Sequence, residues 1–187
     1  MKKQVLFIQG SGAGAYQEDE KLVKSLREAL GSEYNVLYPK MPEEESSGYE
    51  DWKLQISKEL AALDGGLILV GHSVGSSILL KYISEERVEN PLTGIFLIAA
   101  PYWGIGGWQM DEFVLDEGQA SKLLKAIPIF FYHSRDDEVV SFAHLARHAE
   151  KFPGATIREF EGRGHQFNND LSEVAVDILS LSDPQQA

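Results

Sequence analysis

Residues Gly66–Leu80 read GLILVGHSVGSSILL. The run from Leu67 to Val70 is apolar at every position and stands between glycines, which is typical of a strand buried on both faces of a parallel sheet. The next five residues, Gly71–Gly75, match the pattern G-x-S-x-G, in which a serine occupies a sharp turn from a strand into a helix. Such a turn strains the serine backbone and leaves no room for a Cβ two residues away, so glycines are needed on both sides.

After this turn, apolar residues recur at helical spacing: Ile78, Leu79, Tyr82 and Ile83. A helix is therefore expected to begin at Ser73 or just after it. Its free N-terminal amides and positive dipole end would point to where an oxyanion forms beside the serine. Ser73 is thus the candidate nucleophile, and the alternative is a structural serine in a glycine-rich turn. His72 is expected to pack behind the turn or in the core rather than to react.

The composition limits the possible functions. A chain of 187 residues suits one domain, here residues 1–187, that buries about 70% of its unfolded surface. The formal net charge of -12 argues against a nucleic acid or an anionic membrane as partner. The absence of cysteine excludes disulfides, thiolate catalysis and zinc sites built on cysteine. Because no apolar run is long enough for a signal peptide or a membrane span, we expect a cytoplasmic location.

Alternation of apolar strands with amphipathic helices predicts an α/β fold, a mainly parallel sheet covered by helices on both faces. Six strands are expected, at residues 5–8, 34–38, 67–70, 94–100, 128–133 and 156–160. Helices are expected at residues 22–30, 49–63, from 73 onward, around 120–124, at 142–149 and at 171–181. Residues 182–187 are expected to be a frayed tail.

A glycine-rich loop follows the first strand. Gly10, Gly12 and Ala15 have the spacing of a dinucleotide fingerprint in its G/A form. However, Tyr16–Glu20 is expected to delay the helix that should open from such a loop, and its carboxylates suit a pyrophosphate badly. We favour the other interpretation, in which the backbone N–H of Ser11 serves an oxyanion hole, and we expect no cofactor.

Two further loops carry a candidate acid and a candidate base. Residues 134–140 read SRDDEVV, and a carboxylate on a loop after a late strand is where an acid that orients a histidine belongs. Asp137 is favoured because it begins D-x-V-V, and Asp136 is the alternative. His165 lies between glycine and glutamine in the loop after the last strand. The chain order of serine, acid and histidine is that of the α/β-hydrolase arrangement.

An aromatic segment and two histidines leave alternatives open. Trp103 and Trp108 alternate with glycines after a strand, so they either wall a pocket for an apolar ligand or pack onto their own loop. With Gly10 they are the candidate substrate-binding residues. His144 and His148 have a spacing compatible with a metal, but no glutamate lies between them as in H-E-x-x-H. They are expected to face solvent, and no metal site is expected.

The chain resembles small, lidless α/β-hydrolases, the compact serine hydrolase family that includes the retinoblastoma-binding serine hydrolase and its bacterial relatives. The resemblance covers nearly the whole sequence and rests on VLFIQG (5–10), EDW (50–52), GHSVG (71–75), QMDEF (109–113), SRDDEVV (134–140) and GRGH (162–165). It implies a catalytic triad of Ser73, Asp137 and His165, with oxyanion amides at Ser11 and Val74. The sequence departs from most α/β-hydrolases at Gln9, where they have histidine.

The resemblance implies a serine hydrolase that acts on a small-molecule substrate, with a short-chain carboxylic ester or thioester as the expected class. A peptidase that uses the same triad is one alternative. A catalytically idle fold kept as a protein-binding module is another, although such a module has no need of a serine, an acid and a histidine in these places. No oligomeric state follows from the sequence.

Overall fold

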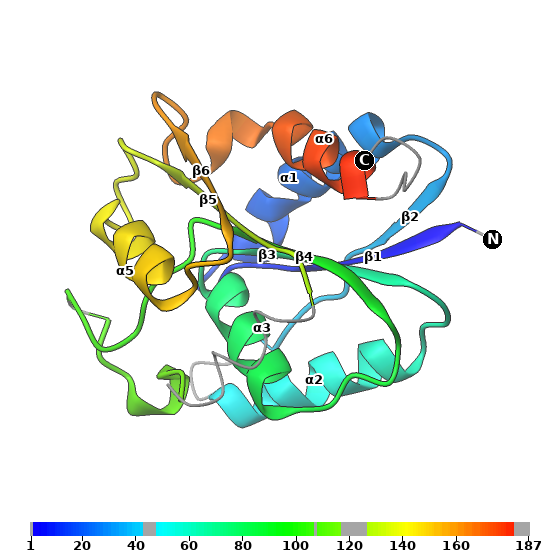
Figure 1. The fold of residues 1–187 in the computed structure, drawn as a ribbon, viewed down its shortest axis with the longest axis horizontal. Coiled ribbons are helices and arrows are strands. Elements are labelled where there is room, and N and C mark those ends of the chain that lie inside the picture. The colour runs from blue at the N-terminus through cyan, green and yellow to red at the C-terminus, as the bar shows by residue number, and fades with distance from the viewer. Residues whose placement is uncertain (1, 43–47, 107, 117–126, 182–187) are drawn as a thin grey trace.

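The computed structural model describes residues 2–42, 48–106, 108–116 and 127–181 (Figure 1). At its centre lies an open sheet of parallel strands: β1 (Lys3–Ile8), β2 (Tyr34–Leu37), β3 (Leu67–His72), β4 (Leu92–Ile98), β5 (Ile129–Ser134) and β6 (Thr156–Phe160). Their spatial order is β2-β1-β3-β4-β5-β6. The predicted six-stranded parallel sheet is therefore confirmed.

Helices cover both faces of this sheet. Helices α1 (Ala15–Leu30) and α6 (Ser172–Leu181) pack on one face, and α2 (Tyr49–Ala61), α3 (Val74–Glu85) and α5 (Ala143–Lys151) on the other (Figure 1). Alternation along β1 shows how one strand serves both layers: Val5 and Phe7 join the core under α1, whereas Leu6 and Ile8 join the core under α3. Because both of its faces are buried, the centre of the sheet reads as apolar runs in β3, β4 and β5, whereas the edge strand β6 (TIREF) does not. The predicted three-layer α/β fold is confirmed.

Several element boundaries differ from the sequence-based expectations, and two of the differences have clear local reasons. Helix α1 begins at Ala15, directly after the glycine-rich loop, so Tyr16–Glu20 does not delay it. Its acidic residues fit because Glu18 and Glu20 are exposed, while the buried Asp19 accepts hydrogen bonds. Strand β4 ends at Ile98, two residues before the predicted end, because Ala99 takes a left-handed φ of 50°.

The helix predicted around residues 120–124 and the tail predicted at 182–187 lie outside the described residues. Among the helices that the structure describes, none combines the length and the apolar character needed to cross a membrane.

The expectation that His144 and His148 face solvent is wrong, because both side chains are buried. Nδ1 of His144 accepts the Tyr102 amide proton at 2.9 Å, and Nε2 of His148 lies 3.2 Å from the Ala100 carbonyl oxygen. The His148 ring also stacks on Phe131, and burial lowers the pKa of His148 to about 3. Both neutral rings thus hold the segment after β4. Within the described ranges, no three acidic or histidine side chains gather as a metal site would require.

The turn between β3 and α3 explains the two glycines around Ser73. Ser73 has φ 51° and ψ -128°, a strained conformation for a residue with a side chain. A Cβ on Gly71 would lie 2.7 Å from the Cα of Ser76. A Cβ on Gly75 would overlap the carbonyl oxygen of Gln9 at the end of β1. The helix can therefore approach the sheet only when both positions lack a side chain.

We expect Gly75→Ala to lower the free energy of unfolding by about 3 kcal/mol, because backbone rather than a flexible side chain must yield to the added methyl group. Gly66→Ala is the matched control, since its Cβ would meet only Thr93 Oγ1 at 3.4 Å, and it should change stability by less than about 0.5 kcal/mol. Urea unfolding followed by circular dichroism measures both. Equal midpoints for the two variants would contradict this account of the turn.

Candidate active site

Three loops at one edge of the sheet bring together Ser73, His165 and Asp137. Ser73 follows β3, Asp137 follows β5 and His165 follows β6, so all three lie beyond the carboxyl ends of parallel strands. Nε2 of His165 lies 3.1 Å from Ser73 Oγ. Nδ1 of the same ring lies 2.9 Å and 3.0 Å from the two oxygens of Asp137. A continuous hydrogen-bonded chain therefore joins the serine hydroxyl to the carboxylate.

The carboxylate of Asp137 fixes the tautomer of His165. A carboxylate accepts hydrogen bonds, so Nδ1 of His165 carries a proton toward Asp137. In the neutral ring, Nε2 is then left with a lone pair that faces the Ser73 hydroxyl. This is the arrangement in which a histidine can accept a proton from a serine.

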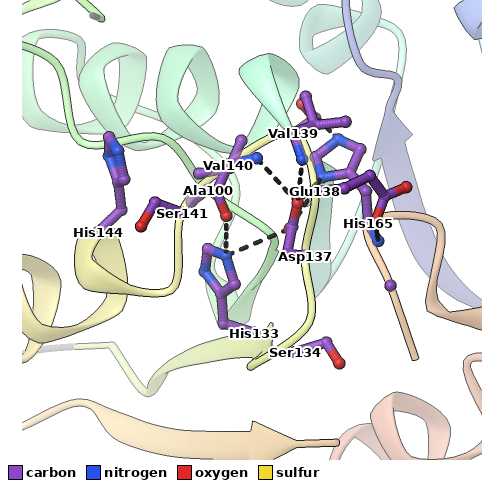
Figure 2. Close-up of polar contacts among 12 residues, drawn as sticks. Ala100, His133, Ser134, Asp137, Glu138, Val139, Val140, Ser141, His144 and His165 are labelled. Carbon is purple, nitrogen blue, oxygen red and sulfur yellow. Dashed lines mark hydrogen bonds and ion pairs between the residues drawn. The ribbon is translucent and has the colours of Figure 1, made fainter. Parts of the chain in front are cut away.

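The side chain of Asp137 has no solvent-exposed surface, and its charge is compensated on several sides. Its Oδ1 accepts the amide protons of Val139 at 2.9 Å and Val140 at 2.8 Å. Figure 2 shows the carboxylate between the rings of His165 and His133, and Nε2 of His133 lies 3.2 Å from Asp137 Oδ2. Burial alone would raise the pKa of Asp137, but the hydrogen bonds from His133 and His165 outweigh it and hold the pKa well below its usual range.

Asp136, the alternative acid, is exposed and has other partners. Its Oδ1 accepts amide protons from Arg163 at 3.2 Å and Gly164 at 3.3 Å, and also accepts the Ser134 hydroxyl proton. Oε2 of Glu138 accepts the amide proton of His165 itself at 3.3 Å. These two carboxylates therefore brace the backbone of the histidine loop, whereas Asp137 contacts the histidine ring.

Ser11 and Val74, the expected oxyanion donors, both line a cavity of about 400 Å³. Residues from α2, α3 and the segment after β4 complete its lining: Trp52, Ile78, Trp103, Trp108, Gln109, Met110 and Phe113. Trp103 is buried, stacks on Phe113 with ring centroids 4.7 Å apart and donates from Nε1 to Ser77 Oγ at 2.7 Å. The aromatic segment therefore packs on its own rings and also lines this cavity, as the Trp103–Trp108 ring contact at 5.1 Å shows.

Gly10, a candidate substrate-binding residue, is buried and is not among the residues that line this cavity. Its amide donates to Asp19 Oδ2 at 2.8 Å. A Cβ on Gly10 would lie 3.3 Å from the Cβ of Ser73, so the loop after β1 presses directly against the serine. Gln9, which stands where most α/β-hydrolases have histidine, is also buried, and its Oε1 accepts the Met41 amide proton at 3.2 Å.

Sequence reasoning missed Asp19 and His133 as neighbours of the site. Asp19 had a detectable signal, because it precedes Leu22 and Val23 by three and four residues and so shares the apolar face of α1. An acidic residue on the buried face of a helix requires hydrogen-bond or ion-pair partners inside the protein. His133 gave no comparable signal, since it sits at the end of a strand that is buried throughout.

Solved structures of low sequence identity share this fold. The crystal structure of YdeN from Bacillus subtilis has a TM-score of 0.72 at 23% identity and covers 97% of this chain and 99% of its own. The meta-cleavage product hydrolase CumD from Pseudomonas fluorescens IP01 has a TM-score of 0.75 at 16% identity, covering 97% and 92%. Est1E from Butyrivibrio proteoclasticus has a TM-score of 0.70 at 15% identity, covering 97% and 88%. The fold is that of the α/β-hydrolases.

Sequence comparisons agree with the fold. YdeN of Bacillus subtilis (strain 168) is 26% identical over 167 residues, which span 88% of this chain and 86% of that protein. The sequence model of the serine hydrolase family matches residues 23–171, well over half of the chain and including all three members of the hydrogen-bonded chain. The protein therefore belongs to the serine hydrolase family.

Proposed function

We propose that this protein hydrolyses a carboxylic ester or thioester through an acyl-enzyme formed on Ser73. The observation that carries the proposal is the hydrogen-bonded chain from Ser73 Oγ through both nitrogens of His165 to Asp137. A chain of this kind lets a serine lose its proton as it attacks a carbonyl carbon. Membership of the serine hydrolase family supports hydrolysis at a serine.

The proposed reaction has two steps. Ser73 Oγ attacks the substrate carbonyl carbon while Nε2 of His165 takes the hydroxyl proton, and the carbonyl oxygen gains the charge of a tetrahedral intermediate. Collapse breaks the bond to the alcohol or thiol, which leaves with the proton from His165. A water molecule then attacks the acyl-enzyme, gives one proton to His165, and its addition product collapses to release the carboxylic acid and restore the Ser73 hydroxyl.

The oxyanion is proposed to lie between the backbone amides of Ser11 and Val74. Val74 is the first residue of α3, so its amide lies among the free donors at the positive end of the helix dipole. Ser11 is exposed and lines the same cavity. Two amide donors at this place would stabilise the developing charge, and losing one such donor costs about 100-fold or more in turnover.

The two alternative functions, a protein-binding module and a peptidase, have less support than ester or thioester hydrolysis. A protein-binding module would not require a buried carboxylate that fixes the tautomer of a histidine beside a serine. A peptidase would use the same three residues, so an ester, thioester and peptide panel separates the two hydrolytic activities.

Ser73→Ala should abolish covalent labelling by a fluorophosphonate probe and lower hydrolysis of p-nitrophenyl butyrate by at least about 1,000-fold. The reason is that the Ser73 hydroxyl is the one bonded to Nε2 of His165. Labelling is read by gel fluorescence and hydrolysis by absorbance. A Ser73→Ala protein that labels and hydrolyses like the parent would refute the proposal, whereas a parent that never labels would favour the binding module.

The two candidate acids give a matched pair of variants. Asp137→Asn should lower kcat by about 10,000-fold, because an amide favours the wrong tautomer of His165. Asp136→Asn keeps an oxygen that can accept the Arg163 and Gly164 amide protons, so its loss should be less than about 10-fold. Steady-state kinetics on the ester compare them. If Asp136→Asn lowered kcat more than Asp137→Asn does, Asp136 rather than Asp137 would be the acid that orients His165.

The lining of the cavity predicts a preference for apolar acyl groups longer than acetyl. Burying one methylene is worth about 0.8 kcal/mol, so kcat/KM should rise about 4-fold for each methylene from p-nitrophenyl acetate to butyrate. Trp108→Ala should flatten this series, whereas Leu54→Ala, at an exposed position on α2, should not. A parent series that is flat, or one that Trp108→Ala leaves unchanged, would contradict the assignment of the cavity to the acyl group.

A further inference from the structure

A second pair of aspartate and histidine lies near Ser73 and is not part of the proposed triad. Asp19 on α1 is 1% exposed, and His72, the last residue of β3, is 2% exposed. The Asp19 oxygens lie 2.9 Å and 3.0 Å from Nδ1 of His72. Their printed hydrogen bonds go to Gly10, Gln166 and the His165 carbonyl rather than to Ser73.

The Asp19 carboxylate gathers donors from three separate segments. Besides His72, it accepts the amide proton of Gly10 at 2.8 Å and a side-chain amide proton of Gln166 at 2.7 Å. Gly10 directly precedes Ser11, the proposed oxyanion donor, and Gln166 directly follows His165. One buried carboxylate is therefore bonded to the sequence neighbours of Ser11, Ser73 and His165, which are three of the groups that the proposed reaction needs.

The surroundings of His72 require protons on both ring nitrogens. Nδ1 faces the Asp19 carboxylate, and Nε2 lies 3.1 Å from the carbonyl oxygen of His165. Both partners accept hydrogen bonds only, so a neutral ring would leave one nitrogen without a proton opposite an acceptor. The imidazolium satisfies both, and the Asp19 carboxylate balances its charge.

The electrostatic setting agrees with a charged ring. Burial alone would lower the pKa of His72, but Asp19 outweighs it and raises the pKa, while the pKa of Asp19 is lowered against its own burial, mainly by His72. The other ionisable groups that face His72 are Asp137, whose charge also favours the imidazolium, and His165, whose ring centroid lies 4.9 Å away.

We propose that Asp19 and His72 form a buried ion pair that positions the loop carrying Ser11 and the loop carrying His165 around Ser73. This inference rests on the proposed hydrolysis at Ser73 and assigns both residues a positioning role. Asp19 holds the Gly10 amide, and His72 holds the carbonyl of the catalytic base itself. A displacement of about 1 Å at a catalytic group costs about 100-fold in rate, so releasing two loops together should be visible in turnover.

Asp19→Asn tests the pair, because asparagine keeps an oxygen for the Gly10 amide but removes the charge that balances His72. We expect kcat for p-nitrophenyl butyrate to fall about 100-fold while KM changes less than about 3-fold, and fluorophosphonate labelling to slow in parallel. Asp177→Asn is the matched control. Asp177 is another buried aspartate, bonded to Tyr132 and Arg158 away from Ser73, so its loss should reduce thermal stability but leave kcat within 2-fold.

The protonation state of His72 can be measured directly, and it distinguishes an ion pair from a pair of residues that only pack together. Two-dimensional ¹⁵N–¹H spectra of the unaltered protein should show His72 with the imidazolium pattern at pH 7, above the usual histidine pKa of about 6.5. The same ring should become a neutral tautomer in Asp19→Asn. This measurement on the parent protein stands even where a variant fails to fold.

A neutral His72 in the parent protein at pH 7 would overturn the ion pair. A folded Asp19→Asn protein with kcat within 2-fold of the parent would overturn the positioning role. Neither result touches the proposed function, which fails separately if the parent protein does not label at Ser73. A parent that labels, a charged His72 and a selective fall in kcat together would support the inference.

Discussion

Helix α3 approaches the end of β1 so closely that position 75 has room for no side chain, and this contact determines where Ser73 stands. Ser73 is held with φ 51°, a conformation that costs about 1–3 kcal/mol and persists only because its surroundings enforce it. The Ser73 amide donates to the carbonyl of Ile98 at 2.8 Å, and the Ser76 hydroxyl bonds the same residue of β4. The serine is thereby fixed at the sheet edge where the acid and histidine loops also end.

Two buried aspartates flank this serine, and each is compensated by histidine and by backbone amides. An isolated buried charge costs several kcal/mol, so neither carboxylate would be tolerated without its partners. Asp137 meets that requirement with the amides of Val139 and Val140 and the rings of His165 and His133. Asp19 meets it with an amide from the first loop and with His72. The two pairs differ in that only the first reaches the serine hydroxyl.

The predictable features were those encoded in neighbouring residues. The strands, the turn at Ser73 and the choice of Asp137 in the D-x-V-V stretch could each be predicted from a few consecutive residues. Long-range partners were not predictable in this way. His144 and His148 are buried beside backbone groups of Tyr102 and Ala100, which precede them by 42 and 48 residues and form hydrogen bonds with their rings. Asp19 lay between these cases. Its position on the apolar face of α1 indicated burial, but its partners Gly10, His72 and Gln166 become neighbours only in the folded sheet.

The reaction centre is tested most directly by a crystal structure of the protein after reaction with diethyl p-nitrophenyl phosphate, which leaves a phosphoryl group on the nucleophile as a mimic of the tetrahedral intermediate. We expect phosphorus bonded to Ser73 Oγ, with Nε2 of His165 beside it and the phosphoryl oxygen within hydrogen-bonding distance of the Ser11 and Val74 amides. Phosphorus on another residue, or a phosphoryl oxygen turned away from both amides, would contradict the convergence of the three loops on a single reaction centre.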